Sequence, residues 1–419
     1  MRTLVVTHYF PPEIGAPQAR LSELARCWAG AGDEVTVLTG MPNHPTGVVA
    51  PGYRRKLRLE EHVDGYRVLR TWLYATPNEG IAKKTLGHLF FMVTSVLLGA
   101  RRSGPADVVV VSSPTFFAIF AAWALAKLKR AAFVVEVRDL WPAIFVELGV
   151  LANRQLVWLL ERLELWAYRA ADAVVVVTGG FRDDLVRRGV PPAKVETVRN
   201  GVDLERFRPT PTEGDVTAAR KRLGAGDVET LVLYIGAHGI SHGLDAVVEA
   251  ARQLDGSRVH VALVGEGAQK AELEQQAAEA DVTNLTMLPG VPREQVPELL
   301  AAADICLVPL RDVPLFASFI PSKIFEYFGS GKAVIGSVAG EAAGILRAGG
   351  ALVVDPHDAA ALARAIDALA QDPERRRAMG RQARSYVAEH FDRRDLAERY
   401  RTRLRSVVRS RRTMARSPA

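Results

Sequence analysis

Short runs of apolar, often β-branched residues alternate with helix-length segments along the whole chain. In the first half the runs read TLVVTH, EVTVLTG, DVVVVSS, AFVVEVRD, AVVVVT and KVETVRN, and in the second half TLVLYIG, VHVALVG, LTMLPG, ICLVPL, AVIGSV and ALVVD. Strands that are apolar along nearly their full length are typical of parallel sheets covered by helices on both faces. The pattern therefore predicts an α/β fold with two doubly wound, Rossmann-like parallel-sheet domains.

Turn residues interrupt this alternation near the middle of the chain, where Asn200-Gly201 is followed by two prolines and a glycine. Such a segment is typical of a linker. We therefore divide the chain into a first Rossmann-like domain (1–203), a second (204–390), and a C-terminal helix with an Arg-rich tail (391–419). The helical residues after about 373 are expected to pack back across the first domain. Because sheets of this kind bind ligands beyond the carboxyl ends of their strands, the two domains are expected to face an interdomain cleft.

Composition excludes several classes of protein. The chain has 419 residues, of which 48% are apolar and 24% charged, as in ordinary globular proteins. Its two cysteines, Cys27 and Cys306, are too far apart in sequence to suggest a disulfide framework or a zinc site, so a reducing compartment is expected. The apolar run before Pro11 is too short for the core of a signal peptide. The chain has no G-x-x-x-x-G-K-[ST], no G-x-G-x-x-G after a strand and no D-x-D pair, which argues against kinase, NAD-dependent and metal-dependent functions.

The net charge of +7 comes from local excesses of basic residues. Residues 399–416 contain eight arginines and no acid, and residues 54–102 contain ten Lys or Arg against four acids. Neither segment interleaves aromatic residues in a nucleic-acid-like stripe, so anionic lipid or a phosphorylated substrate is the expected partner. The tail is expected either to attract an anionic membrane surface or to be a frayed, solvated end.

One uncharged stretch of sixteen residues, Thr85 to Ala100, is flanked by Lys83-Lys84 and by Arg101-Arg102. About 20 apolar residues are needed to cross a bilayer, so this stretch is too short to span one. Its basic flanks favour an interfacial helix in the headgroup region. The alternative is a buried amphipathic helix of the first domain.

Four segments in this order resemble the family 4 glycosyltransferases, which have the GT-B architecture of two Rossmann domains. They are HYFPPEIGAPQAR (8–20), MPNHPTGVVAPGYR (41–54), VRNGVDLERFRP (198–209) and FIPSKIFEYFGSGKAVIGS (319–337). The second and fourth are most similar to the branch that includes N-acetyl-fucosaminyl (fucosamine) transferases of surface-polysaccharide biosynthesis. The resemblance implies transfer of a sugar from a nucleotide diphosphate, with the donor held mainly by the second domain.

For the donor, the resemblance directs attention to the strand-to-helix segment 236–244. It carries His238 and His242 where family members usually have an Arg and a Lys that hold the diphosphate, although both could be ordinary loop histidines. Lys323, at the head of a predicted helix, is the candidate that replaces them, since its ammonium group and the helix N-terminus would stabilise the leaving phosphate; the alternative is a surface lysine. The expected donor contacts are Gly15, Gly236, His238, His242, Gly243, Gly265, Pro321, Ser322, Lys323 and Glu326.

Glu326 matches the second member of the acidic pair that holds the donor in this family, the member that binds the ribose hydroxyls. The first member, which contacts the hexose, falls at Ser318 here. A hydroxyl cannot accept the bidentate hydrogen bonds that a carboxylate can, so altered recognition of the donor sugar is expected. A solvent-exposed helix Glu is the alternative for Glu326.

On the acceptor side, the first domain offers loops at the predicted carboxyl ends of its strands. Asp139 is the candidate catalytic residue beside Lys323, either as the base for the acceptor hydroxyl or as a stabiliser of an oxocarbenium-like transition state. The alternative is that Asp139 caps the next helix. The other residues expected near the acceptor are His8, Asn43, His44 and Arg138.

These inferences predict a metal-independent glycosyltransferase in the cytoplasm, peripheral on the inner face of the cell membrane. No cofactor is expected; the donor substrate is a nucleotide-diphosphate sugar, with UDP-sugar the first choice and an N-acetylated deoxyhexose one candidate sugar. The acceptor would be a saccharide, including a polyprenyl-diphosphate-linked one, and the family implies retention of anomeric configuration. Two other functions stay open: a nucleotide-sugar 2-epimerase, which would consume the donor without an acceptor, and a non-catalytic membrane-associated assembly subunit.

Overall fold

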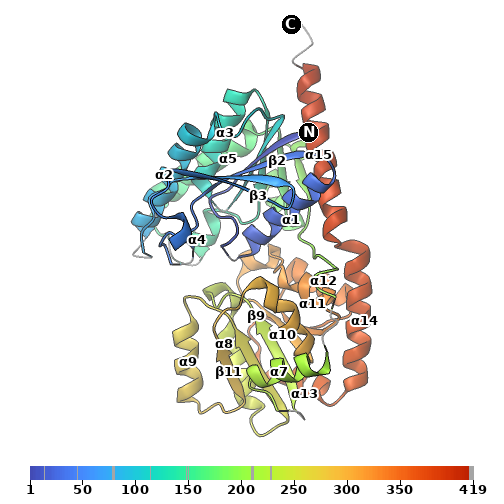
Figure 1. Ribbon diagram of the computed structural model, residues 1–419. Coiled ribbons are helices and arrows are strands. Elements are labelled where there is room, and N and C mark those ends of the chain that lie inside the picture. The colour runs from blue at the N-terminus through green and yellow to red at the C-terminus, as the bar shows by residue number, and fades with distance from the viewer. Residues whose placement is uncertain are drawn as a thin grey trace. The chain divides into compact units, whose positions relative to one another are not determined.

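The computed structural model divides the chain into two compact units, which we call the first and the second unit. The first comprises Met1–Arg199 with Arg394–Ala419, and the second comprises Asn200–Arg393 (Figure 1). The structure describes residues 1–13, 15–44, 46–77, 81–113, 115–147, 149, 151–208, 212–226 and 229–414. Ile14, Pro45, Pro209 and Arg416, which belong to segments discussed above, lie outside the described residues.

The first unit is built on an eight-stranded sheet with the order β3-β4-β2-β1-β5-β6-β7-β8. All neighbouring strands are parallel except β3 and β4. The strands are β1 (Arg2–Val6), β2 (Glu34–Gly40), β3 (Arg58–Val63), β4 (Tyr66–Thr71), β5 (Val108–Ser112), β6 (Ala132–Val137), β7 (Ala173–Val176) and β8 (Val195–Thr197). The apolar runs of the sequence form the six strands other than β3 and β4.

The antiparallel hairpin of β3 and β4 departs from the expected purely parallel sheet. Asp64 and Gly65 join the two strands, and both have positive φ, as a type I′ hairpin turn requires. Because β3 lies at the edge of the sheet and is mostly exposed, its sequence is polar and lacks the apolar run of an inner strand.

The helices of the first unit include one from the far end of the sequence. They are α1 (Ala16–Gly30), α2 (Ile81–Gly99), α3 (Phe116–Lys129), α4 (Ala143–Glu147), α5 (Arg154–Ala170), α6 (Gly179–Arg187) and α15 (Arg393–Met414). On α15, Leu404 and Tyr400 are fully buried in the core, and Tyr400 packs edge-to-face on Trp28 of α1 at 5.3 Å. The Trp28 indole N–H also donates to the Ala397 carbonyl (3.0 Å). The expected return of the chain to the first domain is thus made by α15, which continues as a helix to Met414.

The second unit has a six-stranded parallel sheet with the order β11-β10-β9-β12-β13-β14. These strands match the six apolar runs of the second half: β9 (Thr230–Ile235), β10 (Val259–Val264), β11 (Leu285–Leu288), β12 (Ile305–Pro309), β13 (Ala333–Ser337) and β14 (Leu352–Val354). Its helices are α7 (Glu213–Arg222), α8 (Leu244–Gln253), α9 (Lys270–Glu279), α10 (Val296–Ala302), α11 (Lys323–Gly329), α12 (Gly340–Ala348), α13 (Ala359–Ala370) and α14 (Pro373–His390). Helix α14 packs on α11 and β13, so residues 373–390 do not follow the prediction that they return to the first domain.

Both sheets change winding direction after their first strand. In each sheet the chain moves outward to one edge, then returns and continues on the other side: from β1 to β5 in the first unit and from β9 to β12 in the second. Ligands of doubly wound sheets bind at such switch points, beyond the carboxyl ends of the strands. The fold therefore directs attention to the loops that follow β1, β5, β9 and β12.

Candidate functional site

In the second unit, glycines let the loops at the switch point approach one another at backbone distance. A Cβ on Gly265 would lie 1.8 Å from the Gly236 carbonyl oxygen, and one on Gly267 would lie 2.3 Å from that of His238. Gly243 has φ +58° and its Cα faces the backbone of Arg311, after β12. The loop 236–243, which follows β9, therefore packs closely against the backbone of the loops after β10 and β12, and its glycines leave little side-chain bulk there. We call this glycine-rich loop the cradle.

At the centre of this cradle stands the ring of Tyr234, the last buried residue of β9. The Lys323 ammonium nitrogen lies 3.5 Å from the ring centroid, and the rings of His238 and His242 lie 6.0 and 6.1 Å from it. The Tyr234 hydroxyl donates to the Ala237 carbonyl (2.7 Å). The structure thus brings together Gly236, Gly243, Gly265 and the three basic side chains that sequence singled out, around a tyrosine that it did not.

Burial dominates the electrostatics of this Tyr234 cluster. Desolvation holds the pKa of Lys323 well below its ordinary value of 10.5, against a smaller opposing effect of Glu326. It also lowers the pKa of His238 to about 4 and that of His242 to about 3, with further contributions from nearby lysines. The three side chains are therefore biased toward their uncharged forms.

Glu326 lies three residues beyond Lys323 on α11 and faces Arg293 of the short helix η4 (Arg293–Gln295), with 3.4 Å between a guanidinium nitrogen and a carboxylate oxygen. Both side chains are about one-quarter exposed. Ser318, by contrast, turns its hydroxyl back to the Leu315 carbonyl (2.8 Å). Glu326 is therefore accessible and oriented by Arg293, a residue that the sequence interpretation missed. Pro321 and Ser322 form the turn that leads into α11.

In the first unit, the loop after β1 ends in a cluster of aromatic and imidazole rings. The His8 ring lies 4.4 Å from those of Tyr9 and His88, and the His44 ring lies 5.3 Å from that of Tyr9. The Tyr9 hydroxyl is 3.2 Å from His88 Nε2. Burial lowers the pKa of His8 well below 6.5, and that of His88 to about 4. The expected acceptor residues His8 and His44 are thus neighbours, and His88 of α2 joins them.

Glu13 fastens the two loops that carry these rings. Its carboxylate accepts hydrogen bonds from the backbone N–H groups of Phe10 (2.9 Å), Asn43 (2.8 Å) and His44 (2.8 Å). Asn43 in turn donates from its side chain to the Met41 carbonyl (2.9 Å). The loops after β1 and β2 are therefore one hydrogen-bonded structure, and Glu13, a buried acid in a Pro-rich loop, was not singled out from the sequence.

Arg138 and Asp139 follow β6, two strands away from β1. Burial raises the pKa of the Asp139 carboxyl, while the neighbouring Arg138 opposes that effect. Helix α4 begins only at Ala143, so the alternative that Asp139 caps this helix is wrong. Neighbouring strands are about 4.8 Å apart, so β6, which Asp139 follows, lies about 10 Å from β1 in the sheet.

Gly15 and Arg20 lie at and beyond the start of α1. Gly15 precedes the helix in extended conformation, and a Cβ there would meet only the end of the Gln18 side chain. Arg20 is buried and pairs with Glu136 of β6 (3.1 Å) while also donating to the Val198 and Arg199 carbonyls. Arg20 is therefore part of the core of the first unit, to which Gly15 also belongs, whereas the Tyr234 cluster belongs to the second unit.

Two known protein families match consecutive parts of the chain. One is described as a glycosyl transferase 4-like domain and matches residues 15–201; the other is described as glycosyl transferases group 1 and matches residues 215–386. Together they cover most of both units, in the order that the GT-B architecture requires. The chain is a family 4 glycosyltransferase.

Relatives of this glycosyltransferase include a colanic acid biosynthesis glycosyl transferase, WcaI, of Escherichia coli, 28% identical over 80% of this chain and 83% of WcaI. The 2-deoxystreptamine glucosyltransferase of Streptomyces kanamyceticus is 29% identical over 50% of this chain and 55% of that protein. These relatives do not establish membership of the fucosaminyl transferase branch.

Solved structures with the same fold include the sucrose-phosphate synthase of Thermosynechococcus elongatus (TM-score 0.76, 22% identity, 98% of this chain and 99% of that one). The Anabaena protein HepE, solved with UDP and glucose, has a TM-score of 0.73 at 17% identity, over 97% of this chain and all of HepE. WaaG, a glycosyltransferase involved in lipopolysaccharide biosynthesis, has a TM-score of 0.68 at 18% identity, over 96% and 98% of the two chains. These similarities confirm the GT-B fold.

The glycosyltransferase carries an exposed apolar stripe on α2, outside the residues considered so far. Small or buried residues at every fourth position, Gly87, Phe91, Ser95 and Gly99, face inward, and a Cβ on Gly87 would lie 2.7 Å from the Tyr74 carbonyl oxygen. The larger apolar side chains face outward: Leu86, Phe90, Val93 and Leu97 are 42, 37, 47 and 74% exposed. Phe90 also contacts the half-exposed rings of Trp72 and Tyr74, both at 5.6 Å. No helix in the described part of the chain is long and apolar enough to cross a membrane.

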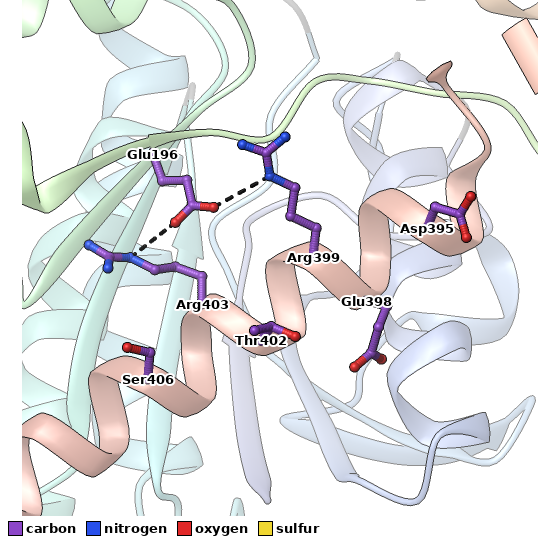
Figure 2. Close-up of a pocket in the computed structure, with 7 residues that line it drawn as sticks. All are labelled: Glu196, Asp395, Glu398, Arg399, Thr402, Arg403 and Ser406. Atoms are coloured by element: carbon purple, nitrogen blue, oxygen red, sulfur yellow. Dashed lines mark hydrogen bonds and ion pairs between the residues drawn. The ribbon is translucent and has the colours of Figure 1, made fainter. Parts of the chain in front are cut away.

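The arginines of α15 are engaged with carboxylates of the first unit. Figure 2 shows Arg399 and Arg403 converging on Glu196 of β8, at 3.5 and 3.4 Å, beside a shallow pocket of about 460 Å³. The other pairs are Arg401 and Arg405 with Asp33, Arg411 with Asp172, and Arg412 with Asp107. Because six of the eight arginines are paired and α15 is helical to Met414, the alternative of a frayed end is wrong for this part of the tail.

Proposed function

We propose that the glycosyltransferase transfers a sugar from a UDP-sugar to a saccharide acceptor presented at a membrane surface, and that it needs no metal ion. The single observation that carries this proposal is the Tyr234 cluster. Three nitrogen-bearing side chains lie around one tyrosine ring, beside a glycine-rich loop at the switch point of the second unit. Donors of this kind suit the phosphate oxygens of a nucleotide diphosphate.

The second unit supplies what donor binding requires. Lys323 would meet the β-phosphate as charge develops on the leaving group. The carboxylate of Glu326, about one-quarter exposed and oriented by Arg293, would accept hydrogen bonds from the ribose hydroxyls. UDP is the proposed nucleotide because HepE, which shares the fold, was solved with UDP and glucose. An N-acetylated deoxyhexose is the proposed sugar, since segments 41–54 and 319–337 resemble the branch that includes N-acetyl-fucosaminyl transferases.

The first unit supplies groups suited to a neutral, hydroxylated acceptor. The uncharged rings of His8, Tyr9 and His88 offer hydrogen bonds and flat faces, and Glu13 fixes the backbone around them. Asp139 is the proposed group that receives the proton of the attacking hydroxyl or balances positive charge on the sugar. Its raised pKa fits this role, because a carboxyl that holds a proton more tightly is the better base.

The stripe on α2 supports a lipid-linked acceptor. Four exposed apolar side chains lie between Lys83-Lys84 and Arg101-Arg102, and these four basic residues are exposed as well. An apolar face with basic flanks is typical of helices that lie in the interface of an anionic membrane. We therefore propose a cytoplasmic enzyme, peripheral on the inner face of the membrane, that acts in the assembly of surface polysaccharide.

A donor panel tests the function directly. Among UDP-, GDP- and dTDP-sugars, we expect a UDP-sugar to raise the unfolding temperature most, because a ligand at 100 times its Kd adds about 2.7 kcal/mol. With this donor and a lipid-linked saccharide, Lys323→Ala should lower turnover about 100-fold, as removal of one preorganised donor does. Lys221→Ala, at an exposed position of α7, is the matched control. A loss under threefold in Lys323→Ala would remove Lys323 from the mechanism.

Two measurements of activity test the reaction itself. EDTA should leave turnover unchanged if no metal ion is needed. Consumption of the donor should require the acceptor, and consumption of the donor alone would indicate an epimerase instead.

Flotation with anionic vesicles tests the membrane assignment. Replacing Phe90 and Leu97 with Ser should reduce flotation, whereas Leu57→Ser, at an exposed leucine outside α2, should not. Equal flotation of both variants would contradict the membrane assignment.

A further inference from the structure

The Tyr234 cluster contains more unpaired nitrogen atoms than packing alone explains. Lys323 Nζ, both ring nitrogens of His238 and Nδ1 of His242 are shielded from solvent and have no hydrogen-bond partner within the described ranges. A buried polar atom without a partner destabilises a fold by about 1–3 kcal/mol. Four such atoms around one ring point to a ligand that accepts hydrogen bonds.

Little negative charge faces these nitrogens. Glu326 is the acid that acts on Lys323 from α11, and Glu266 acts on His238 but is itself paired with Lys270 (3.0 Å). Among the described residues, other titratable neighbours are Tyr234 and Tyr327, whose hydroxyl pKa values burial raises, and the loop after β12 contributes the backbone of Arg311 beside Gly243. In the part of the chain that the structure describes, these two acids therefore act on Lys323 and His238 without forming a hydrogen bond to either side chain's nitrogen atoms.

We propose that the Tyr234 cluster binds a diphosphate together with protons, so that its positive charge rises as the phosphate enters. This inference rests on the proposed function and deepens it: where relatives hold the diphosphate with permanent cations, this chain would create its cations on binding. The protons come from solvent, and no covalent bond is formed or broken. The ligand class is a di- or polyanionic phosphate, such as the diphosphate of a nucleotide or inorganic pyrophosphate.

The direction in which diphosphate affinity changes with pH follows from a comparison of the free and the bound protein. In the free protein, desolvation keeps the pKa of Lys323, His238 and His242 low, whereas a diphosphate nearby would raise all three. Binding then takes up protons and weakens as pH rises through the raised values. Each proton taken up corresponds to about a tenfold loss of affinity per pH unit.

Tyr234 is the proposed positioning residue for the charged form of Lys323. An ammonium group 3.5 Å from a ring centroid gains cation–π attraction that an uncharged amine lacks. Tyr234→Phe retains the ring and should retain proton uptake. Tyr234→Leu removes the ring and should reduce proton uptake, so that UDP binds about tenfold more weakly near neutral pH and its affinity depends less steeply on pH.

Calorimetric titration of the full chain with UDP, in two buffers of different ionisation enthalpy near about pH 8, measures the protons taken up. We expect uptake of about one proton per UDP, the same with pyrophosphate, and none with uridine, which lacks phosphate. Lys323→Met should abolish most of this uptake. Because it removes a buried, unpaired amine, its unfolding temperature should be at least that of the wild type, which excludes misfolding as the cause.

Lys323→Arg gives the sharpest control, since a guanidinium group carries its charge before binding and should bind UDP with little proton uptake. If UDP binds wild type without uptake and with a pH-independent Kd, this inference is wrong while the proposed function stands. If neither UDP nor pyrophosphate binds, both the inference and the proposed donor are wrong.

Discussion

The two units place different chemistry in the loop that follows the first strand of each sheet. The loop after β1 is held by the Glu13 carboxylate, which accepts hydrogen bonds from three backbone N–H groups. These three backbone donors therefore have partners within the unit. After β9, the loop is held by glycine contacts at backbone distance, and the unpaired atoms are side-chain nitrogens of His238, His242 and Lys323. The first loop leaves one side-chain nitrogen unpaired within the described residues, His8 Nδ1, whereas four such nitrogens surround Tyr234, and we propose that a ligand pairs with these four.

This difference suits the loops of the two units to different ligands, one neutral and one anionic. A loop whose backbone is already satisfied can keep its shape while it binds neutral hydroxyls, whose individual interactions are weak. A loop with desolvated basic groups suits an anion, because the anion supplies both the missing acceptors and the charge. On this ground we propose that the first unit binds the acceptor and the second the donor phosphates, and each variant below tests one side of this proposal.

Asp139→Asn should have the largest effect. If Asp139 acts on the acceptor, its amide variant should lower kcat about 100- to 10,000-fold and leave the Kd of UDP unchanged. Glu326→Gln, in the second unit, should instead weaken UDP binding. Since burial raises the pKa of Asp139, wild-type kcat should fall as pH drops through this raised value. Steady-state kinetics and calorimetry provide both quantities.

Glu147→Gln, at an exposed position shortly after Asp139, is the matched control and should behave as wild type. An Asp139→Asn enzyme within threefold of wild type would show that the first unit supplies no acid or base at this position.

Glu13→Ala should have the next largest effect. It should lower the free energy of unfolding and leave the affinity for UDP unchanged. The variant leaves three backbone N–H groups without their acceptor. Each such group costs about 1 kcal/mol or more, so the free energy of unfolding should fall by about 3 kcal/mol. Urea unfolding with hydrogen exchange should locate the loss in the loops after β1 and β2. Glu34→Ala, an exposed acid of the same unit, is the control. Unchanged exchange in these loops would contradict the structural role of Glu13.

Gly236→Ala and Gly15→Ala compare equivalent turns of the two units. A Cβ at Gly236 would lie 2.6 Å from Lys323 Nζ, and φ of +154° disfavours a side chain there. The variant should displace the amine and lower donor affinity about tenfold, as loss of a charge-assisted hydrogen bond does. At Gly15 the backbone is extended and the Cβ meets only the end of Gln18, so its variant should bind UDP as wild type does. Equal effects of both variants would remove the distinction between the two loops.

Much of the fold could be predicted from sequence because inner parallel strands are apolar along their whole length. This pattern predicted all six strands of the second sheet, and the strand-free, Arg-rich end of the sequence predicted a return to the first domain that only α15 makes. The β3-β4 hairpin was missed because an edge strand such as Arg58–Val63 needs little apolar surface. The Asp64-Gly65 pair that joins the two strands was the available signal for this hairpin.

The candidate site was predictable where one local segment carries several special residues, as in 236–244 and 321–326. Tyr234 was missed because it reads as one more apolar residue of a strand, and its role depends on Lys323, 89 positions later in the sequence. Glu13 and Arg293 were missed for a related reason. A charged residue in a loop looks solvent-exposed until tertiary structure gives it partners.

Acid titration should give the smallest effect and tests both units in one experiment. Burial lowers the pKa of His88 in the first unit and of His238 in the second to about 4. Between the unfolded value near 6.5 and these lowered values the unfolded chain binds more protons, so stability is present above pH 6.5 and is lost as pH falls. At about pH 5.5 each histidine should cost about 1 kcal/mol.

Saturating UDP should separate the units, because phosphate favours the protonated histidines of the Tyr234 cluster and has no such effect on the ring cluster of the first unit. Hydrogen exchange at about pH 5.5 should then show restored protection in β9 and β10, whereas β1 and β2 stay weakened. Restoration of both sheets by UDP would mean that the first unit also binds the diphosphate, and the division of labour between the units would be wrong.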